Sequence, residues 1–276
     1  MVTEIGVELA DGRLLHAYDT GGDGPVIYWH HGTPNIGEPP APLLGGGVRW
    51  ISHSRPGYGA STPSPGRSVA SVAADAAAVA DALGVTSFAV MGHSGGGPHA
   101  LACAAQLPGR VTAVVGISGP APYEPFTAAG LDWYTGMADG SAESLRAARA
   151  GREAKERQLA AATGEEDIGF RPADWEALRS DWAWLDSVVA PALLMGPAGL
   201  IDDELAMAGD WSFDPATITC PVLLMHGEAD GMVPAAHSAW LAGHIPGAQA
   251  RLLPDEGHIT VLRHASAALD WLHARP

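Results

Sequence analysis

The sequence predicts an α/β fold, in which helices flank both faces of a mostly parallel central sheet. Short apolar runs rich in β-branched residues alternate with alanine-rich segments that have the spacing of helices. The connections between these segments are short, which is typical of strands and helices that follow one another around a parallel sheet. A chain of 276 residues is also long enough to bury one large core and to carry an insertion.

The first two strands are predicted to form an antiparallel hairpin within residues 4–18. Apolar and polar residues nearly alternate there, and Asp11-Gly12 interrupts the pattern as a turn signal. The other predicted strands are short apolar runs at residues 26–30, 48–52, 86–91, 111–117, 221–226 and, more weakly, 250–253.

Helices are predicted between these runs. Residues 69–83 are alanine-rich with helical spacing, and Gly84 follows them as a C-terminal stop. A second helix is expected at residues 97–106, and a last helix is expected to begin near Ile259 or Thr260.

From about Ala121 to Asp210 the alternation of strands and helices stops. Helical patterns occupy most of this segment, at residues 141–162, 172–190 and 197–209. We therefore expect residues 1–120 and 211–276 to form the α/β core, and residues 121–210 to form a helical cap, or lid, inserted into it.

Composition and charge exclude several classes of protein. The formal net charge of −16 argues against nucleic-acid binding, which needs a basic surface, and against adsorption to anionic membranes. No apolar stretch is long enough to span a bilayer, and the first residues lack the pattern of a secretory signal, so a cytoplasmic protein is expected. Cys103 and Cys220 lie in separate apolar stretches and are expected to pack in the core.

The most informative motif is Gly92-His93-Ser94-Gly95-Gly96, which has the form G-x-S-x-G. It lies between a predicted strand and a predicted helix, so Ser94 would occupy a sharp turn that presents its hydroxyl. A strained turn packed against its neighbours leaves little room for a Cβ atom at Gly92 or Gly96. The motif alone is weak evidence, because glycine-rich pentapeptides also form ordinary turns.

Two later loops supply partners for this hydroxyl. A serine needs a base to become a good nucleophile, and the base needs a group that orients it. Asp230 follows the predicted strand at residues 221–226, and His258 follows the weak strand at residues 250–253. The order along the chain is therefore serine, aspartate, histidine, each just beyond a strand.

This order and these loop positions resemble the α/β-hydrolase family over nearly the whole chain. The resemblance implies the α/β-hydrolase fold and a catalytic triad. In this triad Ser94 is the nucleophile, His258 is the general base and later the general acid, and Asp230 orients His258. Three rival carboxylates lie near the last two of these residues, namely Glu228, Asp255 and Glu256. Asp230 is preferred because it has the family's position after the strand.

The segment His31-Gly32-Thr33-Pro34 resembles the HGxP loop of the family. The resemblance implies that the backbone N–H groups of Thr33 and Gly95 form an oxyanion hole, and that His31, Gly32 and Pro34 support the loop. The segment Arg55–Gly59 resembles the family's glycine-rich loop after the next strand, which we interpret as scaffold.

No metal or cofactor is expected, because the sequence has no HExxH or CxxC spacing and adjacent side chains such as His30 and His31 diverge. His93 is expected to point away from Ser94 and to pack in the core or the pocket wall. Most tryptophans of the insertion are expected in its core, with one or two facing substrate. They are Trp133, Trp175, Trp182 and Trp184.

The resemblance implies a serine hydrolase that cleaves a small carboxylic ester, lactone or amide through an acyl-enzyme. The motifs are similar to those of lidded esterases, lactonases and proline-iminopeptidase-like enzymes. An aminopeptidase would need acidic groups in the lid to hold a substrate ammonium. The candidates are Glu143, Glu153, Glu156, Glu165, Glu166 and Asp167. Because such charges usually form a solvated helix face, an ester or lactone ranks above a peptide.

Two alternatives remain open. The same triad can serve perhydrolysis, carbon–carbon bond hydrolysis or a lyase reaction, because the fold does not determine the chemistry. The chain can also be a ligand-binding homologue without turnover. A serine nucleophile argues against haloalkane dehalogenase and epoxide hydrolase activity, which in similar folds use an aspartate. In each case the expected partner is a small molecule.

Overall fold

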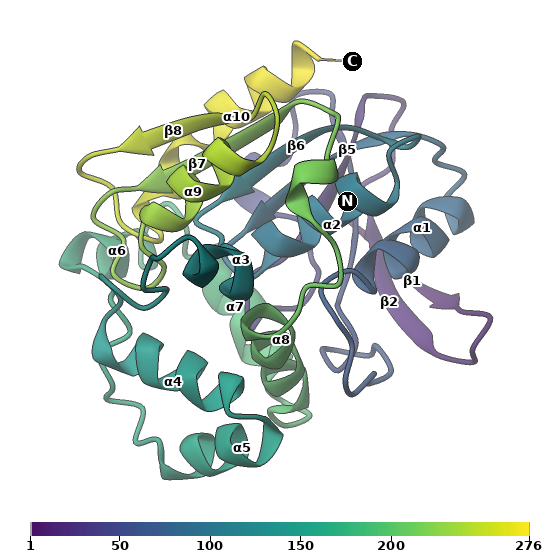
Figure 1. Ribbon diagram of the computed structural model, residues 1–276. Helices are drawn as coiled ribbons and strands as arrows, with labels where there is room; N and C mark the ends of the chain where they lie inside the picture. Colours follow the sequence, from purple (N-terminus) through teal and green to yellow (C-terminus); the bar gives the residue numbers. More distant parts are fainter. Residues whose placement is uncertain (1, 276) are drawn as a thin grey trace.

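The computed structural model describes residues 2–275, and an eight-stranded sheet lies at its centre (Figure 1). The strands are β1 (Thr3–Glu8), β2 (Leu14–Asp19), β3 (Val26–His30), β4 (Arg49–His53), β5 (Phe88–His93), β6 (Val111–Ile117), β7 (Val222–Gly227) and β8 (Gln249–Leu253). Their order across the sheet is β1-β2-β4-β3-β5-β6-β7-β8. Strand β2 is antiparallel to β1 and β4, whereas the neighbouring pairs from β4 to β8 are parallel. The predicted mostly parallel sheet and the initial hairpin are confirmed.

Helices cover both faces of this sheet. One face packs against α1 (Val72–Ala82), α2 (Gly96–Gln106) and α9 (Ala236–His244), and the other packs against α10 (Ala265–His273). Strand β5 illustrates the result, since Val90 belongs to one apolar cluster while Ala89 and Met91 belong to the other. Successive residues point to opposite faces, so a strand covered on both sides is apolar throughout.

Six helices connect β6 to β7. They are α3 (Tyr123–Ala128), α4 (Asp139–Arg149), α5 (Arg152–Ala161), α6 (Pro172–Ala177), α7 (Trp184–Ala192) and α8 (Ala198–Ala208). Helices α4, α5 and α8 contact one another, and α4 and α5 lie far from the sheet (Figure 1). Phe126 of α3 and Val188 of α7 instead join the apolar clusters that cover the sheet. The division into a core and a cap at residues 121–210 stays a prediction.

Some predicted elements have different boundaries. The helical pattern at residues 141–162 is divided between α4 and α5 at Gly151, whose φ of +105° ends the first helix. The last helix begins later than expected, because Thr260–His264 form a 3-10 turn before α10. Gly84 has a φ of +67° just after α1, as a C-terminal stop requires.

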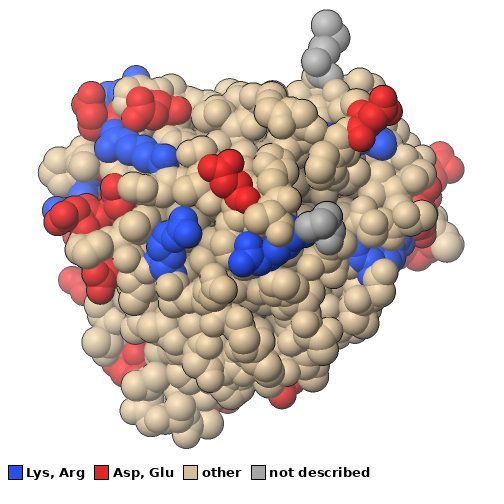
Figure 2. Space-filling model, turned by 90° about the horizontal axis from the view of Figure 1, so that it is seen from above, with Lys and Arg blue, Asp and Glu red and all other residues tan. Residues whose placement is uncertain are grey.

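Within residues 2–275, no helix is both long enough and apolar enough to cross a membrane. The face turned away from α4 and α5 carries acidic and basic side chains in small, interspersed groups, with broad uncharged areas between them (Figure 2). Both cysteines are free; Cys103 is buried, as expected, and Cys220 is partly buried.

Candidate active site

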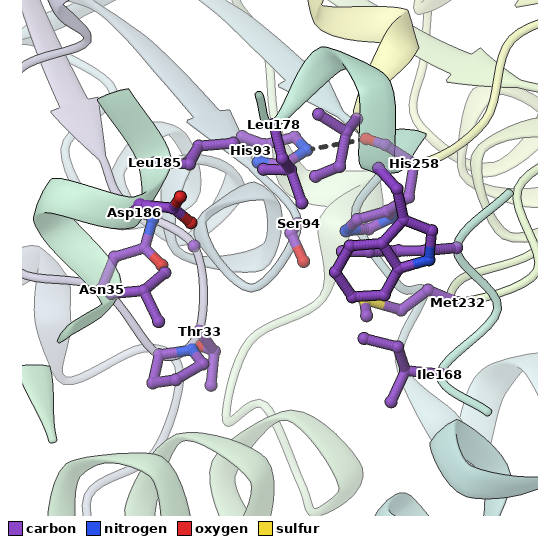
Figure 3. A pocket seen from close by; sticks show the side chains of 16 residues that line it. Thr33, Asn35, His93, Ser94, Ile168, Leu178, Leu185, Asp186, Met232 and His258 are labelled. Atoms are coloured by element: carbon purple, nitrogen blue, oxygen red, sulfur yellow. Dashed lines mark hydrogen bonds between the residues drawn. The ribbon is translucent and has the colours of Figure 1, made fainter. Parts of the chain in front are cut away.

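Ser94 lies in the turn between β5 and α2, with a backbone φ of +53°. Non-glycine residues rarely adopt this conformation, so the surrounding structure must hold it in place. The Ser94 N–H donates a hydrogen bond to the Ile117 carbonyl of β6 at 2.8 Å, and the Gly97 N–H donates to the Ser94 carbonyl at 2.9 Å. The predicted strand-to-helix turn is therefore present, and the Ser94 hydroxyl points into a pocket (Figure 3).

The glycines of this turn are required by close packing. A Cβ atom at Gly92 would lie 2.2 Å from the Gly96 carbonyl oxygen, and one at Gly96 would lie 2.0 Å from the His30 carbonyl oxygen. This confirms the lack of room expected at both positions. A Cβ atom at Gly95 would lie 2.3 Å from the hydroxyl of Thr33. The turn is thus packed directly against the loop that follows β3.

His258 and Asp230 are in direct contact. The His258 Nδ1 atom lies 2.7 Å from the Asp230 Oδ2 atom, and both side chains are buried. Asp230 follows β7 and His258 follows β8, so two neighbouring parallel strands bring them to the same edge of the sheet. Among the rival carboxylates, Glu256 instead binds His264 at 2.8 Å.

The Asp230 carboxylate is held in its ionised form. Burial acts to raise its pKa, but the charge of His258 and the hydrogen bonds from His226 and His258 outweigh burial and bring the pKa well below its usual value. Its Oδ1 atom also accepts hydrogen bonds from the N–H groups of Met232 and Val233, each at 2.9 Å. These contacts fix the orientation of the carboxylate toward the His258 ring.

Ser94 and His258 are brought together as walls of one pocket (Figure 3). Within residues 2–275, the hydrogen bonds of the His258 ring reach Asp230 but do not reach the Ser94 hydroxyl. Hydrogen bonds between a hydroxyl and a neighbouring base often tighten only when a ligand binds.

His93 lies beside His258 in the pocket wall, which fits one of the positions expected for it. Burial lowers the pKa of His93 to about 3, so the ring is neutral at physiological pH. Its Nε2 atom lies 3.1 Å from the His258 carbonyl oxygen and donates to it. The two rings are 5.1 Å apart, so His93 supports the backbone and the ring of His258.

The loop after β3 is held by buried polar contacts. His31 donates from Nδ1 to the Gly32 carbonyl at 2.7 Å, and its Nε2 atom accepts the Arg55 N–H at 3.0 Å. Burial holds the pKa of His31 well below its usual value, which keeps the ring neutral as this pattern requires. Within residues 2–275, the amides of Thr33 and Gly95 have no hydrogen-bond acceptor, so both N–H groups are free to bind a ligand.

Asp203 of α8 was not expected from the sequence, yet it binds this loop. Its buried carboxylate accepts hydrogen bonds from the Thr33 hydroxyl at 2.6 Å, the Tyr58 hydroxyl at 2.9 Å and the Arg55 guanidinium at 2.6 Å. Burial acts to raise the pKa of Asp203, but Arg55 and Arg67 outweigh it and hold the pKa well below its usual value.

Asp174 of α6 plays a comparable part near His258 and was also missed. Its Oδ1 atom accepts hydrogen bonds from the N–H groups of Ile259 and Thr260, both at 2.9 Å. The Asp174 side chain is fully buried. The chain segment after His258 is therefore anchored to a helix that precedes it by more than 80 residues.

Among the tryptophans of the insertion, Trp133 and Trp182 are buried in the apolar clusters, whereas Trp175 lines the pocket. Trp184 is partly buried against one of these clusters, so most of the four tryptophans pack as expected. That one or two of them face substrate stays a prediction. No group of three or more His, Cys, Asp or Glu side chains that could hold a metal is found within residues 2–275.

Comparisons with known proteins agree with this architecture. A family model described as the alpha/beta hydrolase fold matches residues 25–265. The chain is 31% identical over 245 residues to the non-heme chloroperoxidase of Streptomyces lividans, with 84% of each chain covered. This protein therefore belongs to the α/β-hydrolase family of enzymes.

Solved structures share the same fold. An esterase from Thermogutta terrifontis has a TM-score of 0.72 and 22% identity, with 99% of this chain and 98% of that chain covered. The enol-lactonase from Burkholderia xenovorans LB400 has a TM-score of 0.68 and 19% identity, with the same coverage of both chains.

Proposed function

We propose that this protein is a serine hydrolase in which Ser94, His258 and Asp230 form the catalytic triad. One observation carries the proposal. Ser94 occupies a strained strand-to-helix turn and shares its pocket with His258, whose Nδ1 atom is held by the buried Asp230 carboxylate at 2.7 Å. A hydroxyl, an imidazole and an orienting carboxylate are the groups that nucleophilic acyl transfer requires.

The first chemical step follows from the tautomer of His258. In the neutral ring that donates its Nδ1–H to Asp230, the Nε2 atom carries no proton and can take the Ser94 proton. The Ser94 Oγ atom then forms a bond to the substrate carbonyl carbon, and the carbonyl oxygen becomes an anion. Asp230 stays ionised and stabilises the imidazolium that forms.

The anion is stabilised by the free N–H groups of Thr33 and Gly95. Loss of one such donor typically lowers turnover by about 10²–10³. The carbon–oxygen bond to the leaving group then breaks, and His258 gives its proton to the departing oxygen. A water molecule then releases the acyl group. His258 takes a proton from the water, the water oxygen attacks the acyl carbon, and the bond from this carbon to the Ser94 Oγ atom breaks as Ser94 regains its proton. The reaction needs no cofactor.

The proposed substrate is a small carboxylic ester or lactone. The pocket around Ser94 has a volume of about 270 Å³ and is lined mainly by apolar side chains, which suits a small molecule. The names of the Thermogutta esterase and the Burkholderia enol-lactonase support the same class of reaction. An amide ranks third, because amines are poorer leaving groups than alcohols.

Perhydrolysis is a second candidate, because the Streptomyces relative is named a non-heme chloroperoxidase. Hydrogen peroxide in place of water would release the acyl group of the Ser94 ester as a peroxy acid. This reaction uses the same triad and the same acyl-enzyme, so the two candidates differ only in the second nucleophile.

Hydrolysis of 4-nitrophenyl butanoate tests the proposal. The Ser94→Ala variant is expected to lose at least about 10³-fold in kcat, whereas Ser71→Ala, which removes an exposed hydroxyl at the start of α1, keeps wild-type turnover. Turnover by Ser94→Ala at the wild-type rate would overturn the proposal. Formation of peroxy acid from ester and hydrogen peroxide, faster than hydrolysis, would favour the second candidate.

A further inference from the structure

Two cavities meet at Ser94. Both are lined by Ser94 and by four other residues that form their common border, namely Thr33, Pro34, Ile168 and Met232. One cavity, which we name the aromatic chamber, has a volume of about 270 Å³, and the other, the polar chamber, has a volume of about 300 Å³. A substrate attacked by Ser94 can therefore extend in two directions.

The aromatic chamber is lined mainly by large apolar side chains, including Phe170 and Trp175. Leu178, in the same wall, is labelled in Figure 3. Phe170 and Trp175 meet edge to face with ring centroids 5.1 Å apart. Aromatic walls of this kind bind planar or branched apolar groups.

The polar chamber lies between helices α4, α5 and α8, which contribute Ser144, Gln158 and Glu204 to its wall. The rest of the wall is mainly apolar, and a second carboxylate, Glu166, also lines it. Behind them the fully buried Lys155 binds the Glu204 Oε2 atom at 2.7 Å and the Gln158 Oε1 atom at 2.9 Å. Ser144 also donates a hydrogen bond to Glu204 Oε2, at 2.9 Å. The Glu204 carboxylate is thus held in place at the cavity wall.

A carboxylate retains the capacity to accept further hydrogen bonds after such contacts, because its two oxygens offer about four acceptor sites. The charge of Glu204 is balanced by Lys155, so a neutral donor such as a hydroxyl suits this carboxylate. Glu166, the other carboxylate of the wall, already accepts hydrogen bonds from the N–H groups of Thr163 and Gly164. The side chain of Glu204 is 12% exposed, and it lines the cavity. The polar chamber therefore provides a fixed acceptor for a hydroxyl or amide N–H group.

The position of His258 sets the direction in which substrate binds. His258 lines the aromatic chamber and Gly95 lines the polar chamber, while Ser94 and Thr33 border both. The leaving oxygen must lie near His258, since it receives the proton from that ring. The leaving alcohol therefore extends into the aromatic chamber, and the acyl chain extends into the polar chamber.

We propose, on the basis of the function proposed above, that the substrate is an open-chain ester with an aromatic or branched apolar alcohol and an acyl chain that ends in a hydrogen-bond donor. The apolar alcohol packs against Phe170 and Trp175. The donor at the end of the acyl chain binds Glu204.

Two constitutional isomers test this direction. Benzyl 6-hydroxyhexanoate carries the ring on the alcohol and the hydroxyl on the acyl chain, whereas 5-hydroxypentyl phenylacetate has the same atoms with the ester reversed. We expect kcat/KM for the first to exceed that for the second at least tenfold, after both are divided by their rates of hydrolysis by hydroxide. Equal values, or a preference for the second isomer, would overturn the inference.

Variants test each chamber through the ratio of kcat/KM for two substrates of the same protein. Partial unfolding lowers both values equally, so it does not change the ratio. Glu204→Leu, which removes both acceptor oxygens, is expected to lower the preference for benzyl 6-hydroxyhexanoate over benzyl heptanoate at least tenfold. Trp175→Ala, at a position that is 43% exposed, is expected to lower the preference for benzyl over ethyl 6-hydroxyhexanoate to a similar degree. Leu194→Ala, at an 80% exposed position that lines neither chamber, leaves both ratios unchanged. Unchanged ratios in the first two variants would contradict the assignment of the chambers.

Failure of the proposed function gives a different result. If Ser94→Ala hydrolyses these esters as fast as the wild-type protein does, the triad is wrong. If Ser94→Ala is inactive and the isomer preference is absent or reversed, the triad stands and only the assignment of the chambers fails.

Discussion

The Asp203 carboxylate of helix α8 lies 2.6 Å from the hydroxyl of Thr33, in the loop that follows β3. The two residues are 170 positions apart in the sequence. Arg55 extends the contact, because its guanidinium binds Asp203 and also donates to the carbonyls of His31 and Gly32 at 2.6 and 3.0 Å. A helix between β6 and β7 thus positions the loop that carries one proposed oxyanion donor.

Asp203→Asn is expected to lower kcat on a simple ester about 10–100-fold while KM changes less than about threefold. The amide keeps the size of the carboxylate but loses the charge that binds two arginines, so the Thr33 N–H shifts from its best position. Steady-state kinetics with 4-nitrophenyl butanoate measures both constants.

Asp202→Asn is the matched control for this change. Asp202 is the preceding residue on α8, is also buried, and binds Arg152 without contact to the loop. Similar losses of kcat in both variants would indicate general disruption of α8 instead of a specific effect on Thr33.

Asp174→Ala is expected to lower both the free energy of unfolding and kcat. The change leaves the buried N–H groups of Ile259 and Thr260 without their acceptor, and one such unsatisfied group costs about 1–3 kcal/mol. The segment after His258 then loses its anchor. Urea denaturation measures the stability, and wild-type values of both stability and kcat would refute this role for Asp174.

Gly95→Ala is expected to reduce ester hydrolysis at least about 10²-fold. The added Cβ atom would lie 2.3 Å from the Thr33 hydroxyl, so the two proposed oxyanion donors must move apart. Gly243→Ala in α9 is the control, because a Cβ atom there has nothing within 4 Å and the change adds about 0.5–1 kcal/mol of helix stability. Full activity of Gly95→Ala would contradict the requirement for close packing between Gly95 and Thr33.

Stability is expected to fall as the pH drops from about 6.5 toward 4. Burial lowers the pKa of a set of histidines, to about 4 in His53 and His237, to about 3 in His93, and well below the usual value in His30, His31 and His99. Below the unfolded pKa of about 6.5, the unfolded chain binds protons that the folded chain excludes. Between these two pKa values, each such histidine lowers the free energy of unfolding by about 1.4 kcal/mol for each unit by which the pH falls. Asp203 and Asp230 have lowered pKa values in the folded protein, so their protonation reduces the free energy of unfolding only below the unfolded pKa of about 4.

Urea denaturation at several pH values between 7.5 and 4.5 measures this dependence. The His237→Gln variant removes one of the titrating groups and should reduce the slope by the contribution of about one proton. A stability that is constant between pH 7 and pH 5 would show that these histidines do not titrate on unfolding.

Much of the fold was accessible from local sequence patterns. The apolar runs and the alanine-rich helices repeat at the spacing of an α/β sheet, and the hairpin turn at Asp11-Gly12 has a local signal. Helix α9 was not predicted, because it is short and lacks a side-chain N-cap. The division between α4 and α5 depends on the φ of one glycine, Gly151, which a helical pattern does not reveal.

The candidate site was only partly accessible from the sequence. Ser94, Asp230 and His258 lie in loops just after strands, so the order of elements predicts that they meet. Asp174 and Asp203 had no such signal, because each lies within a helical pattern where an acidic residue usually faces solvent. Their function depends on contacts with loops 85 and 170 residues away, which only the packed structure reveals.

Reaction with a fluorophosphonate tests the central claim most directly. The probe is incubated with wild-type protein and with the Ser94→Ala and His258→Ala variants, and the labelled peptide is identified by mass spectrometry. We expect one phosphonyl group on Ser94 in the wild-type protein, none in Ser94→Ala, and labelling at least about 10³-fold slower in His258→Ala. Labelling of another residue, or labelling of Ser94 at the wild-type rate without His258, would contradict the proposed triad.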